Sequence, residues 1–416
     1  MNNLNPSKIL LFSLSTWLII FTIIPYKYYF NESPNEAIFF ALLCFFAFFL
    51  GTFFCNDKIS DNEIINTKNV KLIFNISFLL GVIGVLFRLY ERIFLDSVLM
   101  YDNFTEYRFE SLQQEDQLSI AGVLGSLFYP FGLSALLIYI YYNKIIYINK
   151  LPVYAFGSFF PIEAIFLGGR LNIIVFSLIL FFAFQINSIK DKGKLILPNL
   201  RNSILVISIF FLFSLYSLNI VLTRFDQMGF DFTNYLNFLE ISRNLEISSY
   251  FYNFADQRNF DLTSTYFFIL VEMMHYYVSG LVEFIKLYNF NLSGFDPYFG
   301  SHQFNVFLKF FGFLGFDTIS FMDTHDNHHQ IGQYTSFLGP AYIDFGKYSI
   351  FYLFLLGYVS KKIYFSMSKG LISGQLLYPY VLTVVILSPM NHFFMQQYLY
   401  IFTAIIITIT MFKIRL

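Results

Sequence analysis

Charged side chains are scarce in this chain of 416 residues. Asp, Glu, Lys and Arg together make up 13% of it, against about 25% in an ordinary soluble domain. Hydrophobic residues make up 56%, and the mean hydropathy is +0.59. A soluble globule of this size cannot bury so much apolar surface, and the same composition excludes intrinsic disorder. The sequence therefore predicts a polytopic membrane protein.

Other absences narrow the function. The formal net charge is −1, so we expect neither a basic surface for nucleic acid nor an acidic tail. The two cysteines, Cys44 and Cys55, are eleven positions apart on one apolar run, which is about 16 Å along a helix and too far for a disulfide. No Walker motif, dinucleotide fingerprint or nucleophile elbow occurs. We therefore expect no cofactor, no redox chemistry and no covalent catalysis.

Apolar runs long enough to cross about 30 Å of hydrocarbon as a helix recur along the chain. Helices are the only open-chain structures that satisfy their backbone groups in lipid, so we expect an all-α fold. The first run lacks a small-residue cleavage site and is predicted to be a retained helix, not a signal peptide. We predict ten spans, near residues 9–26, 36–55, 72–90, 119–142, 151–168, 171–187, 203–222, 336–359, 372–390 and 397–413. If residues 265–288 and 304–316 also cross, the count is twelve.

An even number of spans puts both termini on one side of the membrane, and the charge bias predicts that this side is the cytoplasm. The short inner loops then hold almost only lysines, whereas most cations of the outer segments are arginines. Lysine suffices as a point charge that fixes topology, whereas the planar guanidinium of arginine suits a phosphate or a carboxylate. We therefore expect an anionic ligand at the outer face. Chance combined with snorkelling at helix ends is the alternative.

The spans are unevenly distributed. The sequence predicts a seven-helix bundle over 1–222, a large outer loop region over 223–335 and a three-helix segment over 336–416. In the loop region, residues 265–288 are apolar except for five side chains within an arc of roughly 80° on a helix, namely Glu272, His275, Ser279, Glu283 and Lys286. A helix with one narrow polar stripe is expected to lie at the membrane interface or to line a watery cavity. A true span is the alternative.

A tight outer turn joins the fifth and sixth predicted spans. Its glycines, Gly168 and Gly169, permit unusual backbone angles and close approach of a ligand, and Arg170 follows them. Glu163 lies two helical turns before Arg170 on the same face, in the apolar region, where an acid is costly and is a functional candidate by default. A structural Glu163–Arg170 ion pair is the alternative.

Two further groups lie in the outer region. Arg224 directly follows the seventh span and either anchors the helix end or faces a phosphate at the headgroup level. Residues 323–330 hold three histidines, including His325 and His328, next to aspartates. A histidine is a natural general base, and a neighbouring Asp can orient its ring. A metal site is less favoured because no zinc signature is met, and a solvated polar loop is the simplest alternative.

Asp344-Phe345-Gly346 spells the magnesium motif of protein kinases. No glycine-rich phosphate loop, strand lysine or catalytic-loop signature accompanies it, so we discount the kinase interpretation. Asp344 is instead expected early in the eighth span, with Lys347 one turn later as a candidate partner.

Residues 328–346 (HHQIGQYTSFLGPAYIDFG) resemble the bacterial Wzy-type polymerases of O-antigen and capsule repeat units. In that family a threonine, here Thr335, and a short apolar stretch with glycine precede an Asp-Phe-Gly that opens the span after the large outer loop. The turn before Arg170, the position of Arg224 and the predicted spans fit the same pattern. The resemblance implies a glycosyltransferase-C-like enzyme of the inner membrane. Its implied substrates are undecaprenyl-pyrophosphate-linked glycans at the periplasmic face, and its partners include membrane lipids, a chain-length regulator and a flippase.

The resemblance also implies a mechanism. The growing chain on its lipid pyrophosphate is the donor, and a hydroxyl of a new lipid-linked repeat unit is the acceptor. Arginines stabilise the leaving pyrophosphate because it gains charge in the transition state; the candidates are Arg170 and Arg224, with Arg243 and Arg258 in reserve. The candidates for the base are, in order, His325, His328 and Glu272. The supporting residues are expected to be Gly168, Gly169, Glu163, His275, Tyr334, Thr335 and Asp344.

Three other functions remain open. An O-antigen ligase uses the same donor but transfers the glycan to the lipid A core. A flippase for lipid-linked oligosaccharides is expected to carry charges along the middle of several spans, and intramembrane charge is sparse here. A purely structural membrane protein is the third alternative.

Overall fold

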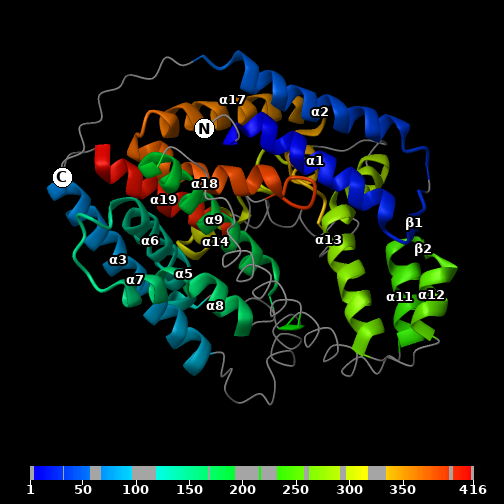
Figure 1. Ribbon diagram of the computed structural model, residues 1–416, viewed down its shortest axis with the longest axis horizontal. Coiled ribbons are helices and arrows are strands. Elements are labelled where there is room, and N and C mark those ends of the chain that lie inside the picture. The colour runs from blue at the N-terminus through cyan, green and yellow to red at the C-terminus, as the bar shows by residue number, and fades with distance from the viewer. Residues whose placement is uncertain are drawn as a thin grey trace.

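The computed structural model describes residues 4–30, 32–56, 67–95, 119–166, 169–192, 215–216, 232–256, 262–290, 297–316, 334–392 and 397–413. These residues are mostly helical (Figure 1). The N-terminal elements are α1 (Pro6–Ile23), β1 (Tyr26–Tyr28), α2 (Asn35–Phe54), α3 (Thr67–Tyr90) with the π-helical turn η2 (Glu91–Leu95), α5 (Ile120–Phe128), α6 (Pro130–Tyr142), α7 (Lys150–Gly157), α8 (Phe159–Phe166) and α9 (Leu171–Lys192). The C-terminal elements are α11 (Phe232–Arg243), β2 (Leu245–Ile247), α12 (Ser249–Asp256), α13 (Leu262–Phe290), α14 (Asn305–Phe313), α16 (Leu338–Phe345), the 3₁₀ turn η6 (Gly346–Tyr348), α17 (Ser349–Ser368), α18 (Ile372–Ile386) and α19 (Gln397–Lys413).

Within the described part of the chain, six stretches are long and apolar enough to cross a membrane. They are α1, α2, α3 with η2, α5 with α6, α9, and residues 266–290 of α13. Two shorter apolar helices, α18 and α19, accompany them. The prediction of a helical membrane protein is confirmed, whereas the number of ten spans stays a prediction. Of the predicted span 203–222, only residues 215–216 lie within the described residues.

The helix α2 has one face with exposed apolar side chains and one face that packs against another helix. Its side chains Phe39, Phe46 and Phe53 are 63%, 58% and 80% exposed, as expected for a face that contacts lipid. The opposite face lies along α17 (Figure 1). A Cβ added at Gly51 would collide with a backbone carbonyl of α17, and one at Gly357 with a backbone carbonyl of α2. Glycine therefore lets the two helices touch through their backbones, as is common between membrane helices.

The helix α18 occupies the centre of the bundle. Nearly all of it is buried, and it contacts α1, α9, α17 and α19. The hydroxyl groups of two buried tyrosines reach backbone carbonyls: Tyr378 donates to Leu4, and Tyr380 donates to Tyr398 at 3.1 Å. These bonds satisfy the hydroxyls in the core and tie both ends of the chain to the same helix.

The predicted span 336–359 is wrong as one continuous helix. It is divided into the short buried α16 and the long α17, and Gly346 between them has a φ of +54°. Glycine adopts this left-handed conformation without the steric cost that a Cβ brings. The helix that lies along α2 therefore begins at Ser349.

The predicted outer region has a small core of its own. The strand β1, which links α1 to α2, pairs antiparallel with β2, with Tyr26 opposite Ile247 and Tyr28 opposite Leu245. This two-stranded ladder is an exception to the all-α expectation. Figure 1 shows α11, α12 and part of α13 gathered beside the ladder. Their shared core consists of Ile24, Tyr26, Leu236, Leu239, Leu245, Ile247, Phe251, Phe268, Ile269 and Val271.

Candidate functional site

Two of the predicted phosphate-binding arginines meet at one aromatic ring. The guanidinium carbon of Arg170, just before α9, lies 5.1 Å from the centre of the Tyr276 ring on α13. The guanidinium carbon of Arg243, the last residue of α11, lies 5.9 Å from the same centre. Both distances permit attraction between a cation and an aromatic face. All three residues are partly accessible, so the cluster can contact a ligand.

The two arginines differ in their charge partners. Arg243 bonds to both carboxylate oxygens of Glu272, at 3.4 and 3.2 Å, and the Glu272 side chain is 4% exposed. Arg170 has no carboxylate partner among the described residues. Within the part of the chain that the structure describes, the cluster around Tyr276 therefore carries one guanidinium without a carboxylate counter-ion, which favours an anionic ligand.

Glu272 is held from a second side. The hydroxyl of Tyr26, on β1, donates to its Oε1 atom at 3.1 Å. Because Arg243 and Tyr26 both occupy this carboxylate, the geometry gives Glu272 a role in holding Arg243 beside the Tyr276 ring. Its role as a general base stays a prediction.

The polar stripe predicted on residues 265–288 is buried against protein. Glu272, His275 and Glu283 are 3%, 4% and 5% exposed. The Nδ1 atom of His275 lies 2.8 Å from the hydroxyl of Tyr28, and burial raises the pKa of this tyrosine. Lys286 bonds to Glu283 at 2.9 Å and donates to the backbone carbonyl at the end of α11 at 2.6 Å. Three of the five stripe residues are thus covered by protein, and Ser279 and Lys286 are partly accessible. The interfacial position, the watery cavity and the true span stay predictions.

Tyr334, singled out by the family resemblance, lies near the same cluster, with its ring centre 6.3 Å from that of Tyr276. The carbonyl of Thr335 accepts a bond from the Gly339 amide at 2.9 Å, at the start of α16. The amide of Ser336, next along the chain, donates to the Met390 carbonyl at 3.2 Å. The strand-like segment before α16 is therefore fixed to the segment that follows α18, and this places Tyr334 beside α13.

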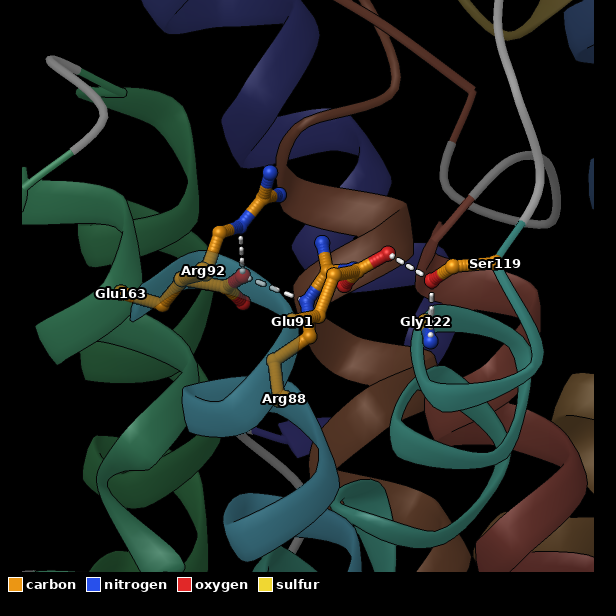
Figure 2. Close-up of polar contacts among 6 residues, drawn as sticks. All are labelled: Arg88, Glu91, Arg92, Ser119, Gly122 and Glu163. Carbon is orange, nitrogen blue, oxygen red and sulfur yellow. Dashed lines mark hydrogen bonds and ion pairs between the residues drawn. The ribbon is translucent and has the colours of Figure 1, made fainter. Parts of the chain in front are cut away.

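Glu163 belongs to a separate charged cluster (Figure 2). Its Oε1 atom accepts from the Nε atoms of Arg88, at 2.6 Å, and Arg92, at 3.3 Å. Arg88 also pairs with Glu91, whose Oε1 atom accepts from the Ser119 hydroxyl at 3.0 Å. The alternative of a Glu163–Arg170 pair is wrong, because the carboxylate turns toward α3 and Arg170 lies over Tyr276.

The local structure explains why this cluster forms. Arg88 lies in the last turn of α3, and the π-helical turn η2 begins at Glu91; such turns are frequent at functional sites. The Glu91 carboxylate occupies the space where a Cβ of Gly122 would lie. Sequence reasoning did not select these residues. The available signal was the spacing of Arg88, Glu91 and Arg92, which places three ionisable groups on one helical face near a span end.

Asp344 has a different partner from the one expected. Its two carboxylate oxygens accept from the backbone amides of His302, at 2.9 Å, and Gln303, at 3.0 Å. Asp344 is fully buried, whereas Lys347 is exposed. The hydroxyl of Tyr352 then donates to Oε1 of Gln303 at 2.9 Å. Asp344 therefore fastens the segment before α14 to the junction between α16 and α17, and a pairing with Lys347 is excluded.

Several predicted site residues lie outside the described residues, namely Gly168, Arg224, Arg258, His325 and His328. Gly169 is described, and its amide donates to the Ala164 carbonyl at 2.7 Å, which closes the turn before Arg170. The described part of the chain holds no group of three or more His, Cys, Asp or Glu side chains arranged to bind a metal.

No family model, curated protein or solved structure matches the chain.

Proposed function

We propose that the protein is a bacterial inner-membrane glycosyltransferase that polymerises undecaprenyl-pyrophosphate-linked oligosaccharide repeat units, like the Wzy-type family. The observation that carries the proposal is the convergence of Arg170 and Arg243 on Tyr276, with Arg170 lacking a carboxylate partner among the described residues. The proposal includes ten spans, a glycosyltransferase-C-like architecture and both termini in the cytoplasm.

The reaction needs a group that stabilises a diphosphate as it leaves. The acceptor hydroxyl oxygen bonds to the anomeric carbon, the bond from this carbon to the pyrophosphate oxygen breaks, and the hydroxyl proton passes to a base. The lipid pyrophosphate gains negative charge in this step, so a positioned guanidinium stabilises the transition state more than the ground state. Arg170 is suited to this role because no carboxylate among the described residues neutralises it.

Arg243 contributes a second guanidinium, oriented by Glu272. With Glu272 engaged in this way, His325 and His328 stay the first candidates for the base. The rings of Tyr276 and Tyr334 add apolar faces that suit stacking against sugar. The reaction draws its energy from the activated donor and therefore needs no nucleotide pocket.

The decisive experiment is the glycan ladder of a deletion strain complemented with variants. The deletion is expected to leave a single repeat unit on the lipid core, and the wild-type gene restores the ladder. Arg170→Ala is expected to abolish the longer rungs, and Arg170→Lys to shorten the ladder because the planar fork is lost. Lys27→Gln is the matched control, since Lys27 is a cation of the same end of the molecule with a side chain 71% exposed.

Three other outcomes of these experiments either indicate a different function or contradict the proposal. Long polymer that is not attached to the lipid core in the deletion strain identifies a ligase. An unchanged ladder with Arg170→Ala, at normal protein level, contradicts the proposed role of the arginine cluster. Reporter fusions that place Arg170 in the cytoplasm contradict the whole proposal, because the lipid-linked donor is polymerised at the periplasmic face.

A further inference from the structure

A cavity of about 530 Å³ lies at the end of α1 and α2 that is remote from β1. It is bounded by the first turn of α1, the last turn of α2 and the C-terminal half of α17. Figure 1 shows the start of α1 beside α17 and well separated from the β1–β2 ladder. The cavity is therefore distinct from the arginine cluster around Tyr276. By the predicted topology it opens at the cytoplasmic side.

The lining of this cavity is amphipathic. Aromatic side chains form an apolar part, and amide, hydroxyl and ammonium groups form a polar part. The apolar part includes Phe49, Phe53 and Phe365, and the polar part includes Asn5, Thr52 and Lys361. A lining of this kind suits a ligand with a polar head and an apolar body, and a volume of several hundred Å³ admits a lipid headgroup with the first part of its chains.

Lys361 supplies the charge. Its ammonium nitrogen lies 4.6 Å from the ring centre of Tyr364 and 4.8 Å from that of Phe365. Within the described residues, no carboxylate pairs with it. Contact with aromatic faces compensates a cation only in part. A half-buried ammonium group that no described carboxylate balances therefore favours an anion in the cavity.

The hydrogen-bond donors indicate where such an anion is held. The hydroxyl of Thr52 donates to the Phe49 carbonyl at 2.8 Å and lies 2.6 Å from that of Ser7, so the protons of this hydroxyl pair are already used. The side-chain oxygen of Asn5 accepts from the Ser7 amide at 3.2 Å, which leaves the NH₂ group of Asn5 as a donor. Lys361 and Asn5 together offer ammonium and amide protons to phosphate oxygens.

We propose that this cavity binds the phosphate headgroup of an anionic membrane lipid. Basic pockets between membrane helices are a known means of holding such headgroups, and here the aromatic part of the lining faces the start of the lipid chains. The inference does not rest on the proposed glycosyl transfer, because it uses a different end of the molecule and different residues.

The test measures lipid retained by the purified full-length protein in an uncharged detergent, by native mass spectrometry. Phosphatidylglycerol is compared with phosphatidylcholine of the same acyl chains. The wild type is expected to retain phosphatidylglycerol preferentially, and Lys361→Gln to reduce this retention about tenfold, the effect of losing one charge-assisted contact. Lys362→Gln removes an equal charge from an exposed neighbour and is expected to leave retention unchanged. Lys361→Arg is expected to preserve it.

Three results overturn the proposal. The first is equal retention of phosphatidylglycerol by Lys361→Gln and Lys362→Gln. The second is equal retention of the two lipids by the wild type. The third is displacement of phosphatidylglycerol by inorganic phosphate at the same concentration, which identifies a soluble anion as the ligand. If Lys361→Gln does not fold, Asn5→Asp decides, since it preserves the helix cap and adds a repelling charge; unchanged retention in that variant also overturns the proposal.

Discussion

Removal of the Glu163 charge is a direct test of how the helices α3 and α8 are held together. Among the residues drawn in Figure 2, two arginines contact two glutamates, and Glu163→Gln removes the carboxylate that Arg88 and Arg92 share. The Glu163 side chain is only 11% exposed. Breaking a buried pair from one side typically costs roughly 3–5 kcal/mol. Because Glu91 still balances Arg88, we expect the free energy of unfolding to fall by about 2 kcal/mol.

The assay is a pair of double-mutant cycles on the free energy of unfolding. Unfolding is followed by helical circular dichroism as dodecyl sulfate is titrated into uncharged micelles. The Glu163→Gln/Arg88→Gln cycle is expected to give a coupling energy of about 1.5 kcal/mol, and the Glu163→Gln/Arg170→Gln cycle less than about 0.5 kcal/mol. The reverse order of the two couplings would refute the geometry of Figure 2, because it would restore the Glu163–Arg170 pair. An unchanged stability of Glu163→Gln would refute the energetic reasoning.

Three further predictions follow from local contacts. Gly51→Ala forces a Cβ into the backbone of α17 and is expected to lower the free energy of unfolding by about 2 kcal/mol. The lipid-facing control Phe53→Ala is expected to change the free energy of unfolding by less than about 0.5 kcal/mol. Equal effects of the two substitutions contradict the close contact between α2 and α17. Tyr26→Phe removes a hydrogen bond to Glu272 and is expected to reduce long polymer severalfold in the complementation assay. A wild-type glycan ladder in this variant argues against a role of Tyr26 in positioning Glu272. The Tyr29 hydroxyl and a lysine ammonium lower the pKa of Glu246. The ionised Glu246 therefore stabilises the pairing of β1 with β2 above the ordinary acid pKa, and this effect is lost as the pH falls through the lowered value. Amide exchange of β2, corrected for intrinsic rates, is expected to accelerate below about pH 4. A constant protection factor contradicts this prediction.

Hydropathy along the chain was enough to predict the helical membrane architecture. The predicted runs 9–26 and 36–55 correspond to α1 and α2 within a few residues, because the cost of exposing backbone to lipid is met by each helix on its own. The same local logic identified residues 265–288 as a helix with its polar groups on one face, and α13 spans Leu262–Phe290. Periodicity shows that these groups share a face. It does not show what covers them.

The partners of the charged groups were decided by tertiary structure. Glu163 and Arg170 are neighbours along a helical face in sequence, yet Glu163 pairs with Arg88 of another helix, and Arg170 meets Arg243 across the ring of Tyr276. An ion pair between helices depends on how the helices pack and rotate against each other. A single sequence without such packing information ranks only pairs on the same helix.

The division of the predicted span 336–359 has the same origin. Its hydropathy is that of one continuous helix, but Asp344 bonds to the backbone amides of His302 and Gln303, and the chain turns at Gly346. An average of side-chain hydrophobicity carries no term for a hydrogen bond to a distant backbone. Local hydropathy therefore predicts which segments are apolar helices, whereas the packing of these helices determines where they break and which charges they bring together.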